Sequence, residues 1–295
     1  MKASGIAAVV LGAGALASAQ QQPPATEVFL ADFGPSGIAA VRNISNSPGY
    51  DNQPHFLPDG RTLLFASNRD GKQTDIFRYD IAADRLTQLT RTPEAEYSPT
   101  PTPDGKGFSV IRVEADGAQR LWRFDPDGGN PGIVLEQVRP VGYHVWIDDT
   151  RLGLFVLGGQ GQPNTLQLAD TRTGVAQVIE QRFGRSLLRR PGTSQISYIH
   201  QPQGEPAVLK ALDPATRTSV TLVPVPTGSQ DLAWLPDGTA LMAQGTTVHR
   251  WRPGEPGWTP VAADLPPTVG TITRLAVSAD GRRLAFVADA RSFSP

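Results

Sequence analysis

Residues 53–79 read QPHFLPDGRTLLFASNRDGKQTDIFRY, and this stretch decides the fold. Its two apolar runs, LLFA and IFRY, follow a Pro58-Asp59-Gly60 turn and the polar loop SNRDGKQT respectively. This order predicts a strand, a tight turn, a second strand, a loop and a third strand. Such a unit cannot bury both of its faces alone, so we expect it to pack against copies of itself.

The unit recurs along the chain. Its turn aligns with five later stretches whose central residues lie 45, 45, 43, 45 and 43 residues apart, within the roughly 40–50 residues typical of four-stranded propeller blades. Apolar residues recur at matched offsets, so that Phe56 aligns with Trp146 and Trp234, and Phe65 aligns with Phe155. The aligned turns are Pro58-Asp59-Gly60, Pro103-Asp104-Gly105, Asp148-Asp149-Thr150, Pro191-Gly192-Thr193, Pro236-Asp237-Gly238 and Ala279-Asp280-Gly281.

The two ends of the chain complement each other. TEVFLAD at 26–32 matches TDIFRYD at 74–80, so the N-terminal segment supplies a third and a fourth strand. RLAVSADGRRLAFVADA at 274–290 supplies a first and a second strand. Joining the termini in one blade removes open sheet edges. We therefore predict an all-β, six-bladed propeller over residues 26–295, with its last blade closed by N-terminal and C-terminal strands together.

Blade four departs from the repeat. It lacks the Pro-Asp-Gly turn and carries Arg189-Arg190 where the other blades carry apolar residues.

The first nineteen residues have the layout of a secretory signal. Lys2 precedes an apolar stretch that ends in Ala17-Ser18-Ala19. We expect a signal peptide over 1–19 and a spacer over 20–25. A membrane anchor needs about 20 apolar residues, and this stretch is shorter, so we expect cleavage near Gln20 and a periplasmic or extracellular protein that does not span the membrane.

Composition narrows the function classes. The 295-residue chain has a formal net charge of −1 and no cysteine. Nucleic acid and anionic membranes are not expected as partners, because both require a clustered basic surface. Without cysteine there are no disulfides, thiolate metal sites or cysteine nucleophiles. We expect a monomer.

The sequence shows no GxSxG, HExxH, glycine-rich phosphate loop or EF-hand motif. The four histidines, His55, His144, His200 and His249, are read as isolated packing or polar residues rather than a metal site. We therefore expect no catalytic residues, metal or cofactor.

Recognition is expected on one face of the propeller. The Asp-Gly turns are short and repetitive, which suits a structural role. The blade-to-blade crossings and the loops between second and third strands vary in charge, and Tyr50, Tyr97 and Tyr143 fall at the crossings, where we place the mouth of the central channel. Loops on a rigid scaffold carry recognition, although solvated loop residues would give the same pattern. The candidate binding residues are Asp51, Asn52, Arg69, Asp70, Glu96, Tyr143, His144, Arg185, Asp231 and Arg274.

The Pro-Asp-Gly turns followed by LLFASNRDGKQTDIFRYD resemble the TolB-type, WD-like propeller repeats of bacterial envelope proteins. The resemblance implies the fold and leaves the activity open, because these repeats occur in TolB, in propellers that precede serine peptidase domains and in stand-alone proteins. It covers the propeller only, without the N-terminal domain of TolB. The expected function is a binding or interaction module with a protein or peptidoglycan-linked partner in the envelope. The alternatives are a channel-mouth enzyme such as a lactonase or lyase, and a structural propeller with no ligand.

Overall fold

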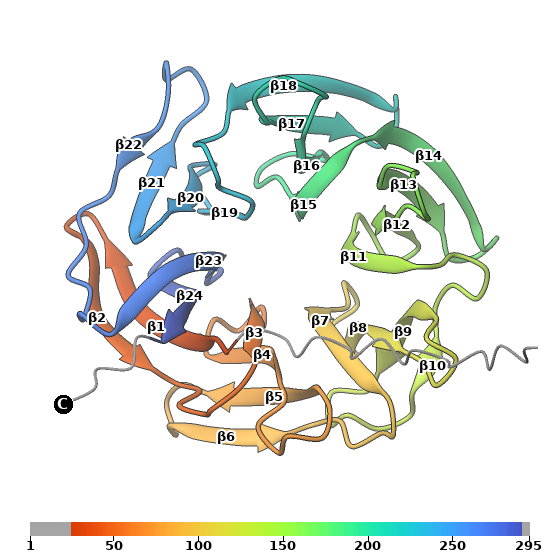
Figure 1. Cartoon of the computed structure of the whole chain (residues 1–295), viewed down its shortest axis with the longest axis horizontal. Coiled ribbons are helices and arrows are strands. Elements are labelled where there is room, and N and C mark those ends of the chain that lie inside the picture. The colour runs from red at the N-terminus through yellow and green to blue at the C-terminus, as the bar shows by residue number, and fades with distance from the viewer. Residues whose placement is uncertain (1–24, 291–295) are drawn as a thin grey trace, which may run out of the picture.

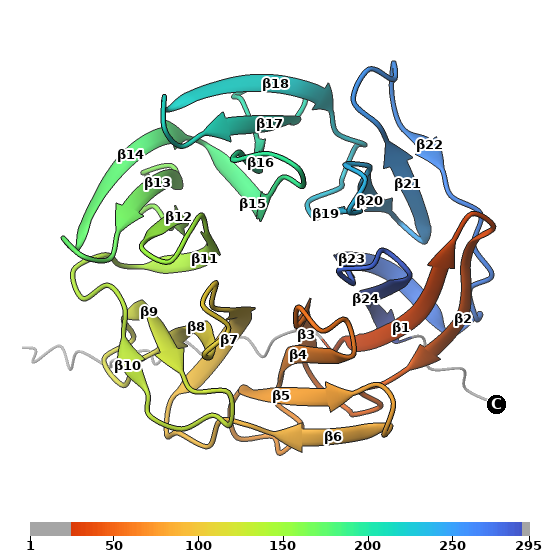
Figure 2. The same cartoon turned by 180° about the vertical axis from the view of Figure 1, so that it is seen from behind.

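The computed structural model describes residues 25–290, so the expected signal peptide lies outside the described residues. The described chain forms six four-stranded antiparallel sheets arranged radially around a central channel (Figures 1 and 2). The prediction of a six-bladed all-β propeller is confirmed. Within residues 25–290 there is no helix of the length and apolarity that crossing a membrane requires.

The strands of each blade run outward from the channel in the order given. Blade one comprises β3 (Asp51–Phe56), β4 (Thr62–Ser67), β5 (Asp75–Asp80) and β6 (Arg85–Gln88); blade two, β7 (Ala95–Pro101), β8 (Phe108–Val113), β9 (Gln119–Phe124) and β10 (Gly132–Ile133); blade three, β11 (Val141–Trp146), β12 (Arg151–Val156), β13 (Thr165–Asp170) and β14 (Val175–Gln181). Blade four comprises β15 (Phe183–Arg189), β16 (Ile196–His200), β17 (Val208–Asp213) and β18 (Thr218–Pro224); blade five, β19 (Leu232–Trp234), β20 (Ala240–Gln244), β21 (Thr247–Trp251) and β22 (Thr259–Pro260); blade six, β23 (Val269–Val277), β24 (Arg283–Ala290), β1 (Glu27–Gly34) and β2 (Gly37–Asn43).

Blade six is built from both ends of the chain, as predicted. β1 pairs with β24 in an unbroken antiparallel register from Glu27↔Ala288 to Asp32↔Arg283. The Phe29 ring from the N-terminal strand stacks on the Phe286 ring from the C-terminal strand, with centroids 5.2 Å apart. The ring of blades is therefore closed by main-chain hydrogen bonds and by an aromatic contact.

The core lies between neighbouring blades. Six buried apolar clusters are present among the described residues, one between each pair of adjacent sheets. Side chains alternate along a strand, so Phe65 faces the cluster shared with blade six while Leu64 and Ala66 face the cluster shared with blade two. Each blade needs both neighbours to bury its two apolar faces.

The innermost strands of all six blades end at the same position of the repeat. That position lies three residues before the centre of the turn, and the strands end there in blades three and four as well, although those blades lack the Pro-Asp-Gly turn. The six residues are Phe56, Pro101, Trp146, Arg189, Trp234 and Val277.

An aspartate holds the turn between first and second strands in every blade except blade four. Asp59 Oδ1 accepts hydrogen bonds from the backbone N–H groups of Arg61 (2.8 Å) and Thr62 (3.0 Å). Gly60 has a φ of 63°, which most side chains disfavour. We name the side of the disc that carries these turns the turn face, and the side that carries the blade-to-blade crossings the crossing face.

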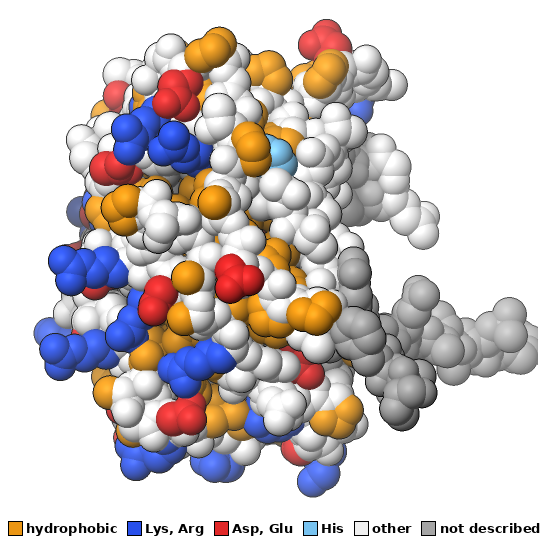
Figure 3. Space-filling view, turned by 90° about the vertical axis from the view of Figure 1, so that its left-hand side faces the viewer, with side chains coloured by type: hydrophobic (Ala, Val, Ile, Leu, Met, Phe, Trp, Pro, Cys, Tyr) orange, Lys and Arg blue, Asp and Glu red, His pale blue; other side chains and the backbone are white. Residues whose placement is uncertain are grey.

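On the outer wall of the disc that Figure 3 presents, acidic and basic side chains are interspersed.

Candidate functional site at the channel mouth

One residue from each blade lines the channel near the crossing face. We name these six residues the mouth ring. They lie six residues before the centre of the turn in every blade, and all of them line a cavity of about 100 Å³. The mouth ring consists of Gln53, Ser98, Tyr143, Ser186, Asp231 and Arg274.

Bulges in the innermost strands orient the mouth ring. The register between first and second strands shifts between Asn52 and His55 in blade one, and a shift that spans or directly precedes the mouth-ring residue occurs in blades two, three, four and six. Gln53, Ser98 and Ser186 have positive φ values of 60°, 54° and 71°. A bulge changes the direction in which a side chain points, and these residues of the innermost strands therefore face the channel.

The central contact of the mouth ring joins opposite blades. Arg274 Nη2 donates a hydrogen bond to Tyr143 Oη at 2.8 Å, and the guanidinium carbon also lies 5.2 Å from the centroid of the Tyr143 ring. β23 and β11 lie on opposite sides of the channel (Figure 1), so this pair spans the opening. The contact narrows the channel just inside the crossing face.

Asp231 lies beside this pair. Asp231 Oδ2 accepts a hydrogen bond from the backbone N–H of Leu275 at 2.8 Å. Burial raises the pKa of the Asp231 carboxyl, while the nearby charges of Arg274 and Arg185 oppose that rise. The mouth therefore holds one carboxyl group among guanidinium groups.

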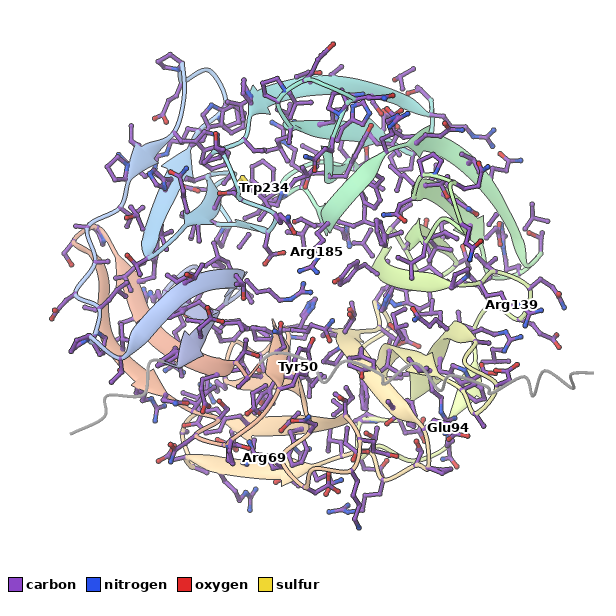
Figure 4. The ribbon with its side chains drawn as sticks, viewed as in Figure 1. Tyr50, Arg69, Glu94, Arg139, Arg185 and Trp234 are labelled. Atoms are coloured by element: carbon purple, nitrogen blue, oxygen red, sulfur yellow. The ribbon has the colours of Figure 1, made fainter. Side chains whose placement is uncertain are left out.

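Arg185 and two tyrosines complete the mouth. Arg185 is exposed and lies over the central opening in Figure 4, and within residues 25–290 its guanidinium has no ion-pair partner. Tyr50 and Tyr97 meet edge to face at 6.1 Å. Burial raises the pKa of Tyr50, which also lies within electrostatic range of Arg274, Tyr143 and Arg185. Tyrosine side chains thus lie near the arginines of the mouth.

Asp51 and Arg69 form a separate ion pair inside blade one. Asp51 is fully buried, and its Oδ1 lies 3.3 Å from Arg69 Nη2. The same Nη2 donates to the Ser45 carbonyl oxygen at 3.2 Å, and the guanidinium stacks on the Phe77 ring. Burial raises the pKa of Asp51 to about 6. Arg69 lies away from the central opening in Figure 4, so the pair ties the β4–β5 loop to the start of β3 and does not face the channel.

Glu96 holds the matching position in blade two. It is fully buried, and its Oε1 lies 3.4 Å from Arg112 Nε and accepts a hydrogen bond from Thr92. Arg112 also pairs with Glu94 and stacks on the Trp122 ring. Burial raises the pKa of Glu96 to about 7.

Of the remaining sequence candidates, Asn52 and Asp70 lie apart from the mouth ring, whereas His144 lines the mouth cavity. Asn52 is buried, and its Nδ2 donates to Thr26 Oγ1 at 3.3 Å. Asp70 is exposed at the loop tip, where its Oδ1 accepts from the Lys72 N–H. His144 lies one residue beyond Tyr143 and contacts Ser109 Oγ through Nε2 at 2.6 Å.

Two histidines line the channel. Burial lowers the pKa of His55 to about 4 and that of His144 to about 3, so both rings are neutral near pH 7. Among residues 25–290, no group of three or more His, Asp or Glu side chains is arranged to hold a metal ion.

The structure thus brings five of the ten candidates together at the mouth and distributes the other five. The five are Tyr143, His144, Arg185, Asp231 and Arg274. The sequence candidates did not include Gln53, Ser98 and Ser186 of the mouth ring. The signal was present, because all six ring residues share one offset from the aligned turns, but the bulges that turn this position inward are not visible in the repeat pattern.

Beyond the mouth ring the channel widens toward the turn face. There a cavity of about 480 Å³ is lined by the ends of the innermost strands and by turn residues such as Pro58 and Pro103. His55 and Thr100 line both this cavity and the smaller one, so the two are consecutive parts of one channel.

Fold and site define a six-bladed propeller with a polar channel mouth. No protein-family model matches the chain. An uncharacterised protein of Agrobacterium fabrum is 26% identical over 100 residues, which is 32% of this chain and 34% of that protein. The Tol-Pal system protein TolB of Bordetella pertussis is 39% identical over 46 residues, which is 16% of this chain and 10% of TolB. The matched segments thus span about a third or less of these relatives.

Solved structures agree over most of the chain. A candidate TolB from Agrobacterium tumefaciens superposes with a TM-score of 0.72 at 15% identity, covering 91% of this chain and 99% of that one. TolB from Acinetobacter baumannii gives 0.58 at 13% identity, covering 90% and 64%. A gluconolactonase from Xanthomonas campestris gives 0.64 at 11% identity, covering 92% and 99%, and an oligogalacturonate lyase with manganese gives 0.56 at 15% identity, covering 85% and 80%. At these identities the likeness shows the propeller fold.

Proposed function

We propose that this protein is an exported binding module that recognises a protein or a peptidoglycan-linked group of the cell envelope through its crossing face. One observation carries the proposal: unlike polar groups from all six blades converge on the channel mouth, with Arg274 and Tyr143 tied across it. Such a surface favours specific recognition, because the six blades contribute five different types of side chain at the same structural position.

The chemistry of the mouth supports recognition rather than packing. Arginine and tyrosine are enriched among the residues that carry binding energy at interfaces. Arg185 is exposed, and Tyr50, Tyr97 and Tyr143 supply flat, amphipathic surface around it. The hydrogen bond from Arg274 to Tyr143 fixes these groups before a partner arrives, which lowers the entropy cost of binding. A partner that presents a carboxylate would fit the exposed guanidinium of Arg185.

The proposed location rests on the leader pattern of residues 1–19 and on the similarity to TolB. The N-terminal domain that TolB carries is not required by this proposal, because the mouth is formed by the propeller alone.

The binding face can be tested with two charge reversals. Purified protein is mixed with isolated peptidoglycan sacculi and, separately, with a detergent-solubilised envelope extract of the source bacterium, and retained partners are quantified. Arg185→Glu on the crossing face should weaken retention about tenfold or more, whereas Arg61→Glu on the turn face should not. Loss of retention only in Arg61→Glu, or no retention by the wild type in either arm, would overturn the proposal.

The catalytic alternative has the fold of the lactonase and the lyase in its favour. It predicts turnover of a sugar lactone or of oligogalacturonate by the purified protein, with and without added manganese or calcium. Turnover by the wild type that is lost in His144→Gln would show that the protein is an enzyme and would overturn the proposal of a binding module.

A further inference from the structure

The widest hollow of the channel opens on the turn face, opposite the proposed recognition surface. This turn-face cavity has a volume of about 480 Å³ and is lined by the residues at which the six innermost strands end. Cavities that bind small molecules are typically about 300–1,000 Å³ and mostly apolar. The turn-face cavity has the size and the lining of such a site.

Its aromatic walls are fixed by hydrogen bonds between blades. The Trp146 indole N–H donates to Ser109 Oγ at 2.8 Å, and the Trp234 indole N–H donates to Ser197 Oγ at 2.8 Å. In both cases the serine lies on the second strand of the preceding blade, and 37 residues separate it from the tryptophan. Figure 4 shows Trp234 at the inner side of blade five, beside the channel. The two indoles are therefore held in place without a ligand.

Arg189 ends the innermost strand of blade four, and the two tryptophans end the innermost strands of the neighbouring blades three and five. Arg189 occupies the repeat position that is apolar in the other five blades, and among residues 25–290 it is the one charged side chain that lines the cavity. Within residues 25–290 its guanidinium has no hydrogen-bond acceptor or carboxylate partner, and the side chain is exposed. The neighbouring Arg190 differs, because its Nη1 donates to Gln195 at 2.9 Å and its guanidinium stacks on Trp234. Packing thus accounts for Arg190 but leaves Arg189 available.

Beyond the inner end of the cavity, the channel is narrowed at the mouth by the Arg274–Tyr143 contact. A ligand in the turn-face cavity therefore enters and leaves by the turn face. A compact molecule suits such a site better than a chain that must pass through it.

We propose that the turn-face cavity binds a small monocarboxylic acid with an apolar, aromatic body, its carboxylate on Arg189 and its ring against the apolar lining to which Trp146 and Trp234 contribute. A guanidinium pairs with a carboxylate through two parallel hydrogen bonds, and the apolar lining removes the ring from water. One guanidinium neutralises one negative charge. A phosphate dianion would leave an uncompensated charge in an apolar cavity, which is unfavourable.

The probes for this site are phenylacetate, indole-3-acetate and 2-naphthoate, each paired with its neutral amide. Titration calorimetry on the full propeller should show saturable binding of at least one acid with a Kd below about 1 mM. The matching amide should bind about tenfold or more weakly, because it cannot form the charged pair.

Two variants assign the site. Arg189→Gln should weaken the acid about tenfold or more and leave the amide unchanged, while Arg61→Gln, on the same face but outside the cavity, should behave as wild type. Arg185→Glu at the crossing face should also bind the acid normally, which separates this site from the proposed recognition surface. The proposal is wrong if no acid binds the wild type in this range, if acid and amide bind equally, or if Arg189→Gln retains wild-type affinity while its thermal unfolding is unchanged.

Discussion

Arg274 Nη2 lies 2.8 Å from Tyr143 Oη although 131 residues separate them in the chain. One residue belongs to the blade that joins the two termini, and the other belongs to the blade directly opposite. Adjacent blades are already held by buried apolar clusters, whereas opposite blades can touch only through side chains in the channel. This contact therefore braces the disc across its diameter and separates the polar mouth from the turn-face cavity.

Removing the hydroxyl of this bridge should destabilise the protein measurably. Tyr143→Phe keeps the ring beneath the guanidinium and deletes only the acceptor, so we expect the free energy of unfolding to fall by about 1.5–3 kcal/mol, as for hydrogen bonds to charged groups. The matched control is Tyr97→Phe, which deletes a neutral contact of 3.3 Å from Thr74 and should cost less. Denaturant titrations measure both, and equal losses would show that the bridge adds nothing beyond an ordinary hydroxyl contact.

Two equivalent serines should differ in importance. Ser109 Oγ contacts both the Trp146 N–H and His144 Nε2, whereas Ser197 Oγ accepts from the Trp234 N–H and donates weakly to Leu188. Ser109→Ala leaves two buried polar groups without partners, each costing about 1–3 kcal/mol, and Ser197→Ala leaves one indole N–H. We expect the larger loss of Tm for Ser109→Ala. The reverse order would mean that the histidine makes no contribution.

Glu96 should make stability depend on pH in a defined direction. Burial raises its pKa from 4.5 to about 7, so the folded protein keeps a proton that the unfolded chain loses between these values. The stabilisation from this group is present below about pH 4.5 and is lost as the pH rises through 7. Glu96→Gln has no proton to lose. Relative to wild type, its free energy of unfolding should therefore increase from pH 5 to pH 8, by about 1.4 kcal/mol for each unit by which the pKa is raised.

His144 provides the control of opposite sign. Its pKa is lowered by burial from 6.5 to about 3, so its contribution is present above pH 6.5 and is lost on acidification. Relative to wild type, His144→Gln should become more stable as the pH falls from 7 to 4. Parallel pH curves for the wild type and both variants would show that neither group is buried as described.

Closure of blade six should be required for cooperative folding. Deleting residues 26–46 removes β1 and β2, exposes the edge of β24 and uncovers Phe286. We expect loss of a single unfolding transition, or aggregation, as for other unprotected edges. The control deletion removes residues 20–24, which precede the first strand, and should be nearly silent. Identical melting curves for the two deletions would contradict the shared blade.

Processing of the leader should be visible by mass. Exported protein is expected to begin at or near Gln20, because Ala17-Ser18-Ala19 is a small-residue cleavage pattern. Intact mass spectrometry of material recovered from outside the cytoplasm measures this directly. Exported protein that still carries Met1 would contradict the predicted secretion signal.

Much of this architecture was predictable because the copies of a repeat can be aligned with one another within a single sequence. Phe56, Trp146 and Trp234 lie at one offset from the turn, and the structure places all three at the ends of innermost strands. The shared blade followed from the match between 26–32 and 74–80, because half a unit at each end can bury its faces only if the halves meet. Arg189 was also visible as a departure from the pattern.

The sequence by itself determined the number of blades, their order and the closure of the ring, because short-range alternation and a regular period are properties of the chain. Tertiary structure alone decided which polar residues meet. Asp51 precedes the bulge of its innermost strand and turns into the blade to pair with Arg69, whereas Arg274 directly follows a bulge of β23 and reaches across the channel to Tyr143. Bulges matter here because a single step along a strand reverses the direction of a side chain.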